Sequence, residues 1–109
     1  MTSCRESVRA LNDALRQHHT GGLIVITPGL KALGSELVGK IVEAIACYQA
    51  FSDDNDPHGE HDFGSVVVQS HVVFFKIDYY DLDLTCGSPD PADPSVTRRV
   101  MTLMLADEY

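Results

Sequence analysis

The sequence has little of what a nucleic-acid-binding or disulfide-bonded protein needs. It contains eight lysines and arginines against sixteen aspartates and glutamates, a formal net charge of −8. Such a chain repels phosphate, which disfavours direct binding of DNA or RNA. Its three cysteines (Cys4, Cys47 and Cys86) are odd in number and show no CxxC spacing. A disulfide framework or a zinc knuckle is therefore not expected, and the thiols indicate a reducing compartment.

Long apolar runs are also missing. No stretch reaches the roughly 18 residues needed to span a membrane, and the N-terminus lacks the apolar core of a signal peptide. We therefore expect a cytoplasmic protein with no membrane partner. The 109 residues, 44% of them apolar, are enough for one hydrophobic core. The sequence predicts a single domain over residues 1–109.

Apolar periodicity places the first elements. The spacing of apolar residues predicts a helix over 3–18, with Ser3 as its N-cap, and a second helix over about 35–48. Between them, the run over 23–27 is continuous and apolar, which is typical of a strand buried on both faces. Gly39 interrupts the second helix at a cost of about 1 kcal/mol relative to alanine, which suggests close packing at that position.

Two further strands, over 63–69 and 72–81, are expected to form an antiparallel hairpin around Ser70 and His71. Alternation on the second strand divides it into two faces. Lys76 and Asp78 share the more polar face, where an ion pair would explain both. The other face is expected to be core, through Val73, Phe75, Ile77 and Tyr79.

The C-terminal part is harder to assign. Residues 81–95 are too rich in proline for a central strand. Asp93 and Pro94 can begin a helix over about 96–106, which we favour, although a strand over 100–105 remains an alternative. The predicted fold is α+β, a single compact domain of two or three helices packed on a small, mainly antiparallel sheet.

The negative charge is concentrated in one half. Residues 1–52 are about neutral, whereas residues 53–109 carry twelve acids against three basic residues. The densest stretch is 53–64, where five carboxylates and two imidazoles fall within ten residues. Chemistry or recognition is expected there, and three interpretations compete.

The first interpretation is a metal site. A calcium-type loop starting at Asp54 fits poorly, because Ser65 occupies the position of the bidentate glutamate. Imidazole with carboxylate suits a transition metal, and the candidate ligands are His61, Asp62 and Asp78. No cofactor is predicted, and a divalent metal ion is kept as an alternative.

The second interpretation is acid–base catalysis by Glu60, His61 and Asp62, with Asp78 nearby. No nucleophile motif accompanies these residues. A carboxylate beside a histidine also often serves only to hold a loop. The sequence does not decide between an enzyme and a protein without catalysis, and it favours a role without catalysis.

The third interpretation is recognition by charge. Asp81 and Asp83, together with Asp54 and Asp56, could present carboxylates spaced like the phosphates of a nucleic acid strand. Such a surface can occupy a basic groove of a protein partner. The plain alternative is a solvated acidic surface.

Several short motifs occur together in this sequence: NDP at 55–57, GEHDFG at 59–64, KIDYYD at 76–81 and the segment from Arg99 to Tyr109. The chain resembles a bacterial family of domains of unknown function with the patterns NDPxGEHDFG and WKIDYYD. Phe75 stands where the family usually has tryptophan, and His58 where tyrosine is usual.

The resemblance implies a small protein often carried on plasmids and prophages, with an accessory or anti-defence role. By analogy with small acidic proteins of such elements, it implies a module that binds a basic protein partner. The favoured hypothesis is an inhibitor of a bacterial nucleic-acid-targeting defence complex, of the anti-CRISPR or anti-restriction type. The alternative is a metal-assisted hydrolytic enzyme that uses Glu60, His61 and Asp62.

Overall fold

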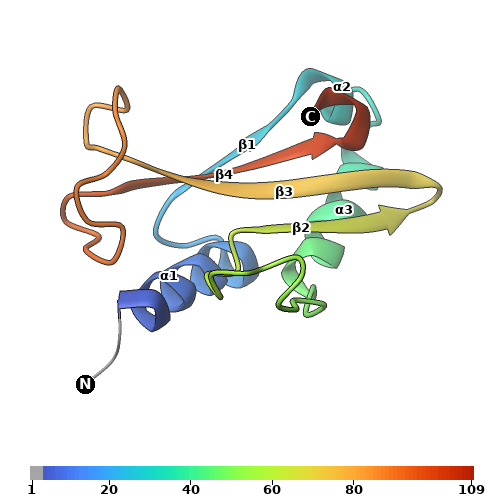
Figure 1. The fold of residues 1–109 in the computed structure, drawn as a ribbon. Coiled ribbons are helices and arrows are strands. Elements are labelled where there is room, and N and C mark those ends of the chain that lie inside the picture. Colours follow the sequence, from blue (N-terminus) through green and yellow to red (C-terminus); the bar gives the residue numbers. More distant parts are fainter. Residues whose placement is uncertain (1–3) are drawn as a thin grey trace.

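Three α-helices and a four-stranded sheet make up residues 4–109, the part of the chain that the computed structural model describes (Figure 1). The expected N-cap at Ser3 lies outside these residues. In chain order the elements are α1 (Cys4–His18), β1 (Leu23–Ile26), α2 (Pro28–Lys31), α3 (Ser35–Ala46), β2 (Phe63–Val68), β3 (His71–Tyr80), β4 (Arg98–Leu105) and a short 3-10 turn, η1 (Ala106–Glu108).

The sheet has the strand order β1-β4-β3-β2. β2 and β4 both run antiparallel to β3, whereas β1 runs parallel to β4. The predicted α+β fold with a mainly antiparallel sheet is therefore confirmed. The helix predicted over 3–18 and the one over 35–48 correspond to α1 and α3, and the two-strand hairpin is also confirmed.

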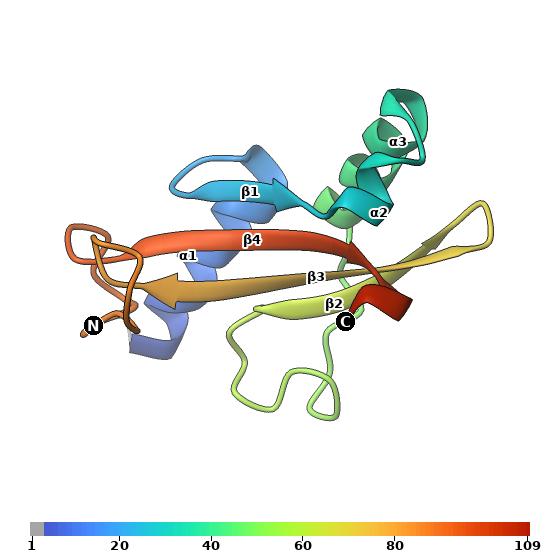
Figure 2. The ribbon, with the colours of Figure 1, turned by 90° about the horizontal axis from the view of Figure 1, so that it is seen from above.

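The core lies between one face of the sheet and the helices α1 and α3. Alternate residues of β3 and β4 point to this face, and α1 and α3 each contribute apolar side chains at helical spacing. Figure 2, in which the molecule is seen from above, shows α1 behind the sheet. The cluster of fully buried side chains consists of Leu15, Leu30, Ile41, Ile45, Val73, Phe75, Ile77, Met101 and Leu103.

The helix predicted over 96–106 is wrong. Residues 94–96 form turns, and Arg98–Leu105 is the strand β4, paired with β1 on one side and β3 on the other. The apolar positions 100, 103 and 104 match a helical spacing, but Met101 and Leu103 also alternate as a strand requires. Because β4 is central, both of its edges gain hydrogen-bonded partners, and this outweighs the local helix-start signal at Asp93 and Pro94.

Two finer predictions are also wrong. β1 is not buried on both faces: Leu23 and Val25 are 52% and 45% exposed, because helices cover only one side of the sheet. Gly39 does not mark close packing, since an added Cβ would meet nothing within 4 Å. It lies on the exposed side of α3.

The hairpin turn lies one residue earlier than expected. Gln69 and Ser70 occupy the turn with φ of 49° and 72°, and Val68 pairs with His71 across it. Two successive residues with positive φ suit the right-handed twist of a hairpin, even without the usual Asn-Gly sequence. The strand faces expected from alternation are unaffected, and Val73, Phe75 and Ile77 are buried.

Candidate functional site

The acidic stretch forms a loop that connects α3 to β2 and lies on the side of the sheet that α1 occupies (Figure 1). Its first part is organised by Asn55, whose Nδ2 donates to the carbonyl oxygen of Ala50 at 2.8 Å and whose Oδ1 accepts from the backbone N–H of Ser52 at 2.9 Å. The backbone N–H of Asp56 also donates to the Ser52 carbonyl at 2.8 Å. The loop is thus a compact, internally hydrogen-bonded turn.

Asp56 faces the interior of this loop. Only 7% of the residue is exposed. Its carboxylate accepts hydrogen bonds from the backbone N–H groups of Glu60, at 3.1 Å, and His61, at 3.2 Å. Gly59 and His61 adopt positive φ, 66° and 57°, to bring the chain back around it. Of the four aspartates predicted to bind a partner, the structure places Asp56 inside, where it orders the loop.

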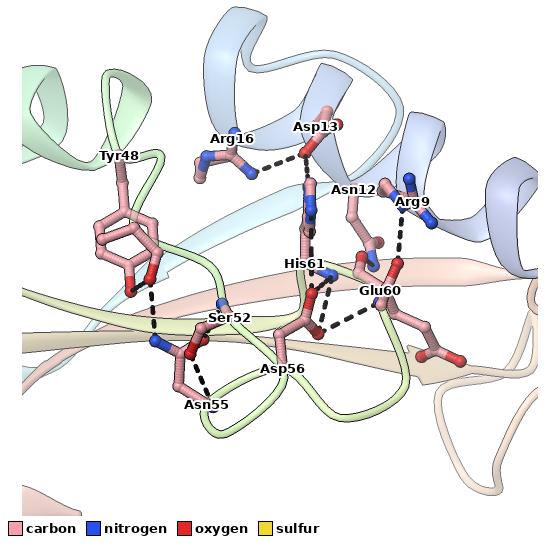
Figure 3. A network of polar contacts seen from close by, with 12 residues as sticks. Arg9, Asn12, Asp13, Arg16, Tyr48, Ser52, Asn55, Asp56, Glu60 and His61 are labelled. Atoms are coloured by element: carbon pink, nitrogen blue, oxygen red, sulfur yellow. Dashed lines mark hydrogen bonds and ion pairs between the residues drawn. The ribbon is translucent and has the colours of Figure 1, made fainter.

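The imidazole of His61 lies between two carboxylates (Figure 3). Nδ1 lies 2.8 Å from Oδ1 of Asp13 on α1, and Nε2 faces Oδ2 of Asp56 at 3.8 Å. The ring stacks on Phe51, with 3.9 Å between centroids and 5° between planes. Because both ring nitrogens face carboxylates of the protein itself, this arrangement joins the loop to α1.

Arg16 continues the contact on the α1 side. Its Nη1 donates to Oδ1 of Asp13 at 2.8 Å, and its guanidinium lies 5.1 Å from the centroid of Phe51. The residue is 2% exposed. Among the described residues, its Nε is the buried side-chain polar atom that has no hydrogen-bond partner.

A second set of buried polar contacts lies beside the first and is centred on Asn12. The side chain of Asn12 is fully buried. Its Nδ2 donates to the Glu60 carbonyl at 2.9 Å and to the Tyr79 hydroxyl at 2.8 Å, and its Oδ1 accepts from Nε of Arg99 at 2.6 Å. The Tyr79 hydroxyl in turn donates to Oε1 of Glu60 at 2.9 Å, and burial raises the pKa of Tyr79. One amide thereby connects α1, the loop, β3 and β4.

Asp62, the third member of the predicted catalytic group, follows His61 at the start of the hairpin. Its carbonyl accepts from the backbone N–H of Ile77 at 2.8 Å. Burial raises the pKa of the Asp62 carboxyl, and the neighbouring carboxylates of Glu60 and Asp56 raise it further. The structure therefore brings Asp62 near the other acids of the loop.

Asp78 is separated from this group. It lies on the other face of the sheet, where its Oδ2 is 3.4 Å from Nζ of Lys76. This confirms the predicted ion pair, and it leaves Asp78 away from His61 and Asp62. Within residues 4–109, no group of three or more histidine, cysteine, aspartate and glutamate side chains is arranged to hold a metal ion.

The remaining predicted partner-binding residues are on the surface, in two different loops. Asp54 is exposed in the loop before β2, and Asp83 is exposed in the connection between β3 and β4. Asp81 begins that connection. Its carboxylate accepts from the backbone N–H groups of Thr85, at 3.0 Å, and Cys86, at 3.4 Å, and the pKa of Asp81 is lowered by these bonds.

An open pocket of about 240 Å³ lies where α1 meets the loop. It is lined by Asp13, Arg16, Gln17, Tyr48, Gln49, Phe51 and His61. In this pocket Oδ1 of Asp13 lies within hydrogen-bond distance of both Nη1 of Arg16 and Nδ1 of His61. The pocket therefore adjoins the contacts that hold the loop.

Sequence reasoning missed the part of this site that α1 supplies. Asn12 and Arg16 follow the buried Val8 at intervals of four residues, so their position on the core-facing side could have been read from helical spacing. What the spacing does not reveal is their partners, which are 48 residues or more away for the Asn12 contacts. Alternation on β3 placed Tyr79 in the core, but it did not reveal the partners of the Tyr79 hydroxyl, and the Arg99 contact was missed for the same reason.

Comparison with protein families places most of the chain in a family. A family model described as "Protein of unknown function (DUF3768)" matches residues 26–108. The matched region contains the acidic loop and strands β2, β3 and β4, whereas α1 precedes it. Comparison with curated proteins and with solved structures gives no match. In residues 4–109 no helix has the length and apolar character needed to cross a membrane.

Proposed function

We propose that this chain, which belongs to the DUF3768 family of proteins of unknown function, is a protein-binding module that presents unpaired carboxylates to a basic partner. The observation that carries the proposal is the state of the surface acids. Asp53, Asp54, Asp83 and Asp90 are exposed, and within residues 4–109 none of them forms an ion pair. Their charge is available to a partner.

The loops that carry these acids are held in place from within. Asp56 and Asn55 order the loop before β2, and Asp81 orders the start of the connection before β4. An ordered loop loses little conformational entropy when it binds, which favours affinity. Asp56 thus supports the proposed role without contacting the partner, and Asp54, Asp81 and Asp83 remain the candidate contact residues.

The chemistry of the partner follows from the charge. A net charge of −8 attracts a positively charged surface over long range and raises the rate of encounter. Basic grooves that bind nucleic acid phosphates carry such a surface. We propose as partner a basic, nucleic-acid-binding protein of a bacterial defence complex, which the module would inhibit in the manner of an anti-CRISPR or anti-restriction protein.

The alternative, a metal-assisted hydrolase, has less support. It requires Glu60, His61, Asp62 and Asp78 to act together, but Asp78 pairs with Lys76 on the other face of the sheet. Metal analysis of protein purified without a histidine tag tests it directly. Stoichiometric metal that is lost in a His61→Ala variant would favour the hydrolase over the binding module.

Capture of proteins from a bacterial lysate tests the binding role. The informative variant carries Asp54→Lys and Asp83→Lys, with Asp81→Asn to remove charge while keeping a hydrogen-bond acceptor. A matched control carries Glu36→Lys and Glu43→Lys, two exposed acids of α3. Captured proteins are identified by mass spectrometry at low and high salt, and with duplex DNA as competitor.

Wild type and the α3 control should retain the same basic, nucleic-acid-binding proteins, and the loop variant should lose them. High salt and duplex DNA should release them as well, because salt screens exposed charges and DNA competes for the same groove. Equal capture by the loop variant and wild type would contradict the proposal, as would equal loss in the α3 control.

A further inference from the structure

Within residues 4–109, neither α1 nor α3 packs on one of the two faces of the sheet. α1 and α3 contribute to the core on the opposite face, and Figure 2 looks onto the other face, with β1, β4 and β3 in front of α1. Register assigns alternate residues of each strand to this face: positions 23 and 25 of β1, 98, 100, 102 and 104 of β4, 72, 74, 76, 78 and 80 of β3, and 63, 65 and 67 of β2. We call it the open face.

The exposed apolar residues of the molecule gather on the open face. Among the described residues, seven large apolar side chains are markedly exposed. Four of them lie on the open face by register, and Tyr109 joins them by packing against Phe63 and Phe74. Their exposed fractions are Leu23 52%, Val25 45%, Val67 67%, Val72 41% and Tyr109 74%. Exposed apolar side chains that gather on one face in this way indicate an interaction surface.

The open face carries no excess of negative charge, unlike the chain as a whole, because exposed Arg98 on β4 adds a positive charge to the pair Lys76 and Asp78. Lys76 and Asp78 lie near its centre on β3, joined at 3.4 Å, with about two-fifths of each side chain exposed. A strongly basic partner, which the acidic loops suit, finds no excess of negative charge here. The open face therefore calls for a different occupant from the loops.

The placement of a positive and a negative charge next to each other on β3 suits contact with a second copy of the chain. We propose that the open face is a two-fold symmetric interface in which Lys76 of each copy faces Asp78 of the other. Residues two apart on a strand project about 7 Å apart on the same side. A two-fold axis passing midway between them brings each charge opposite its complement, so that the patch is complementary to itself.

A second copy would also offset the free energy lost when the Lys76–Asp78 ion pair is removed from water. An ion pair buried under an apolar partner loses its hydration without compensation. In the symmetric arrangement, each ammonium gains a second carboxylate and each carboxylate a second ammonium. The surrounding apolar side chains are then removed from water at the same time.

The size of the open face predicts a weak dimer. Neighbouring strands lie about 4.8 Å apart, and the sheet has four strands. The eight residues of β4 are about 27 Å long, so the face covers roughly 500 Å² on each copy. The two copies together would bury about 1,000 Å², at the lower limit for a specific interface. The dimer should therefore dissociate on dilution, and the net charge of each copy should make it stronger at moderate salt.

Sedimentation velocity over about two orders of magnitude in concentration tests the proposal. Wild type should shift from monomer to dimer with rising concentration. A Val25→Lys, Val67→Lys variant should stay monomeric, although its lower net negative charge would reduce general repulsion between copies. The matched control is Leu82→Lys, Leu84→Lys, which changes two exposed apolar residues of the β3–β4 connection by the same charge and should dimerise like wild type.

A charge exchange tests the symmetry itself. Lys76→Asp alone and Asp78→Lys alone should each abolish dimerisation, because each places like charges opposite one another. An equimolar mixture of the two variants should form a heterodimer, and the double variant Lys76→Asp, Asp78→Lys should recover the homodimer. Melting curves confirm that each variant is folded.

A wild type that remains monomeric throughout would overturn the proposal, and the open face would then belong to a different partner. Dimerisation that survives Val25→Lys, Val67→Lys would overturn it too, as would two charge variants that fail to associate when mixed. These results are independent of the loop variants used above, since none of the substitutions on the open face lies in either acidic loop; only the control residues Leu82 and Leu84 do.

Discussion

Asn12 of α1 and Arg99 of β4 are 87 positions apart in the sequence, yet the buried guanidinium donates to the buried amide at 2.6 Å. The same amide donates to the carbonyl of Glu60 and to the hydroxyl of Tyr79. A single side chain of the first helix therefore satisfies polar groups of the acidic loop and of two central strands. Its removal leaves several buried groups without partners at once.

We predict that Asn12→Ala destabilises the protein by about 2–4 kcal/mol, because a buried charged donor and its neighbours lose their hydrogen-bond partner. Urea unfolding measures the change in the free energy of unfolding. Gln17→Ala, at an exposed position of the same helix, serves as the control and should change stability by less than about 0.5 kcal/mol. Equal effects of the two substitutions would show that the Asn12 contacts do not stabilise the fold.

His61 is expected to hold the acidic loop. Asparagine tolerates the positive φ of this position, so His61→Asn removes the ring without adding backbone strain. The variant loses the Asp13 contact and the stacking on Phe51, and we expect a loss of about 1–3 kcal/mol. Hydrogen exchange should become faster over residues 52–62.

His58→Asn is the matched control, since His58 is exposed in the same loop. It should leave both the unfolding free energy and the exchange rates close to those of wild type. If His61→Asn also leaves them unchanged while it reduces partner capture, His61 would be a contact residue and not a loop-holding one.

Asp62 should give the protein a distinct dependence on pH. Burial raises the pKa of its carboxyl in the folded state, so the ionised form opposes folding. This cost is present at neutral pH, where the side chain is charged in both states, and disappears as the pH falls through the raised pKa. Asp62→Asn should therefore raise the melting temperature at neutral pH, and the gain should vanish at about pH 3.

The control for general charge relief is Asp53→Asn, which removes one charge from an exposed position of the same loop. Melting curves between acidic and neutral pH compare the two variants. A gain from Asp62→Asn that is no larger than that from Asp53→Asn, or that persists at low pH, would contradict the assignment.

Two glycines should respond to alanine in opposite directions. At Gly64 an added Cβ would lie 2.5 Å from a ring carbon of Phe75 and 2.7 Å from one of Tyr48. These rings belong to the core, so Gly64→Ala should cost about 1–3 kcal/mol. At Gly39 of α3 there is open space, and Gly39→Ala should stabilise by about 0.5–1 kcal/mol through helix propensity. Chemical denaturation of both variants measures the difference in sign.

Local pattern was enough to predict α1, α3 and the hairpin. Their apolar residues repeat at the period of the element that they form, as Val73, Phe75 and Ile77 illustrate on β3. It was not enough for β4. Its residues fit two periods, and the choice between them depends on β1 and β3, which flank it in space and not in sequence.

The candidate site was predicted in part. The acidic loop was identified by its composition, and Glu60, His61 and Asp62 do lie together there. The inward position of Asp56 follows from backbone N–H groups that fold back on it, which composition does not reveal. The contributions of Asp13 and Arg16 depend on the packing of α1 against the loop, and helical spacing alone does not specify a partner that far away.

The position of β4 has a consequence for how the protein is made. β4 lies between β1 and β3, yet it leaves the ribosome after both of them. Until it emerges, β1 has no neighbour with which to pair, and the hairpin has an unprotected side. The sheet should therefore assemble late and in one step. A nascent chain stalled before Arg98 should be bound by chaperones and cleaved readily by proteases.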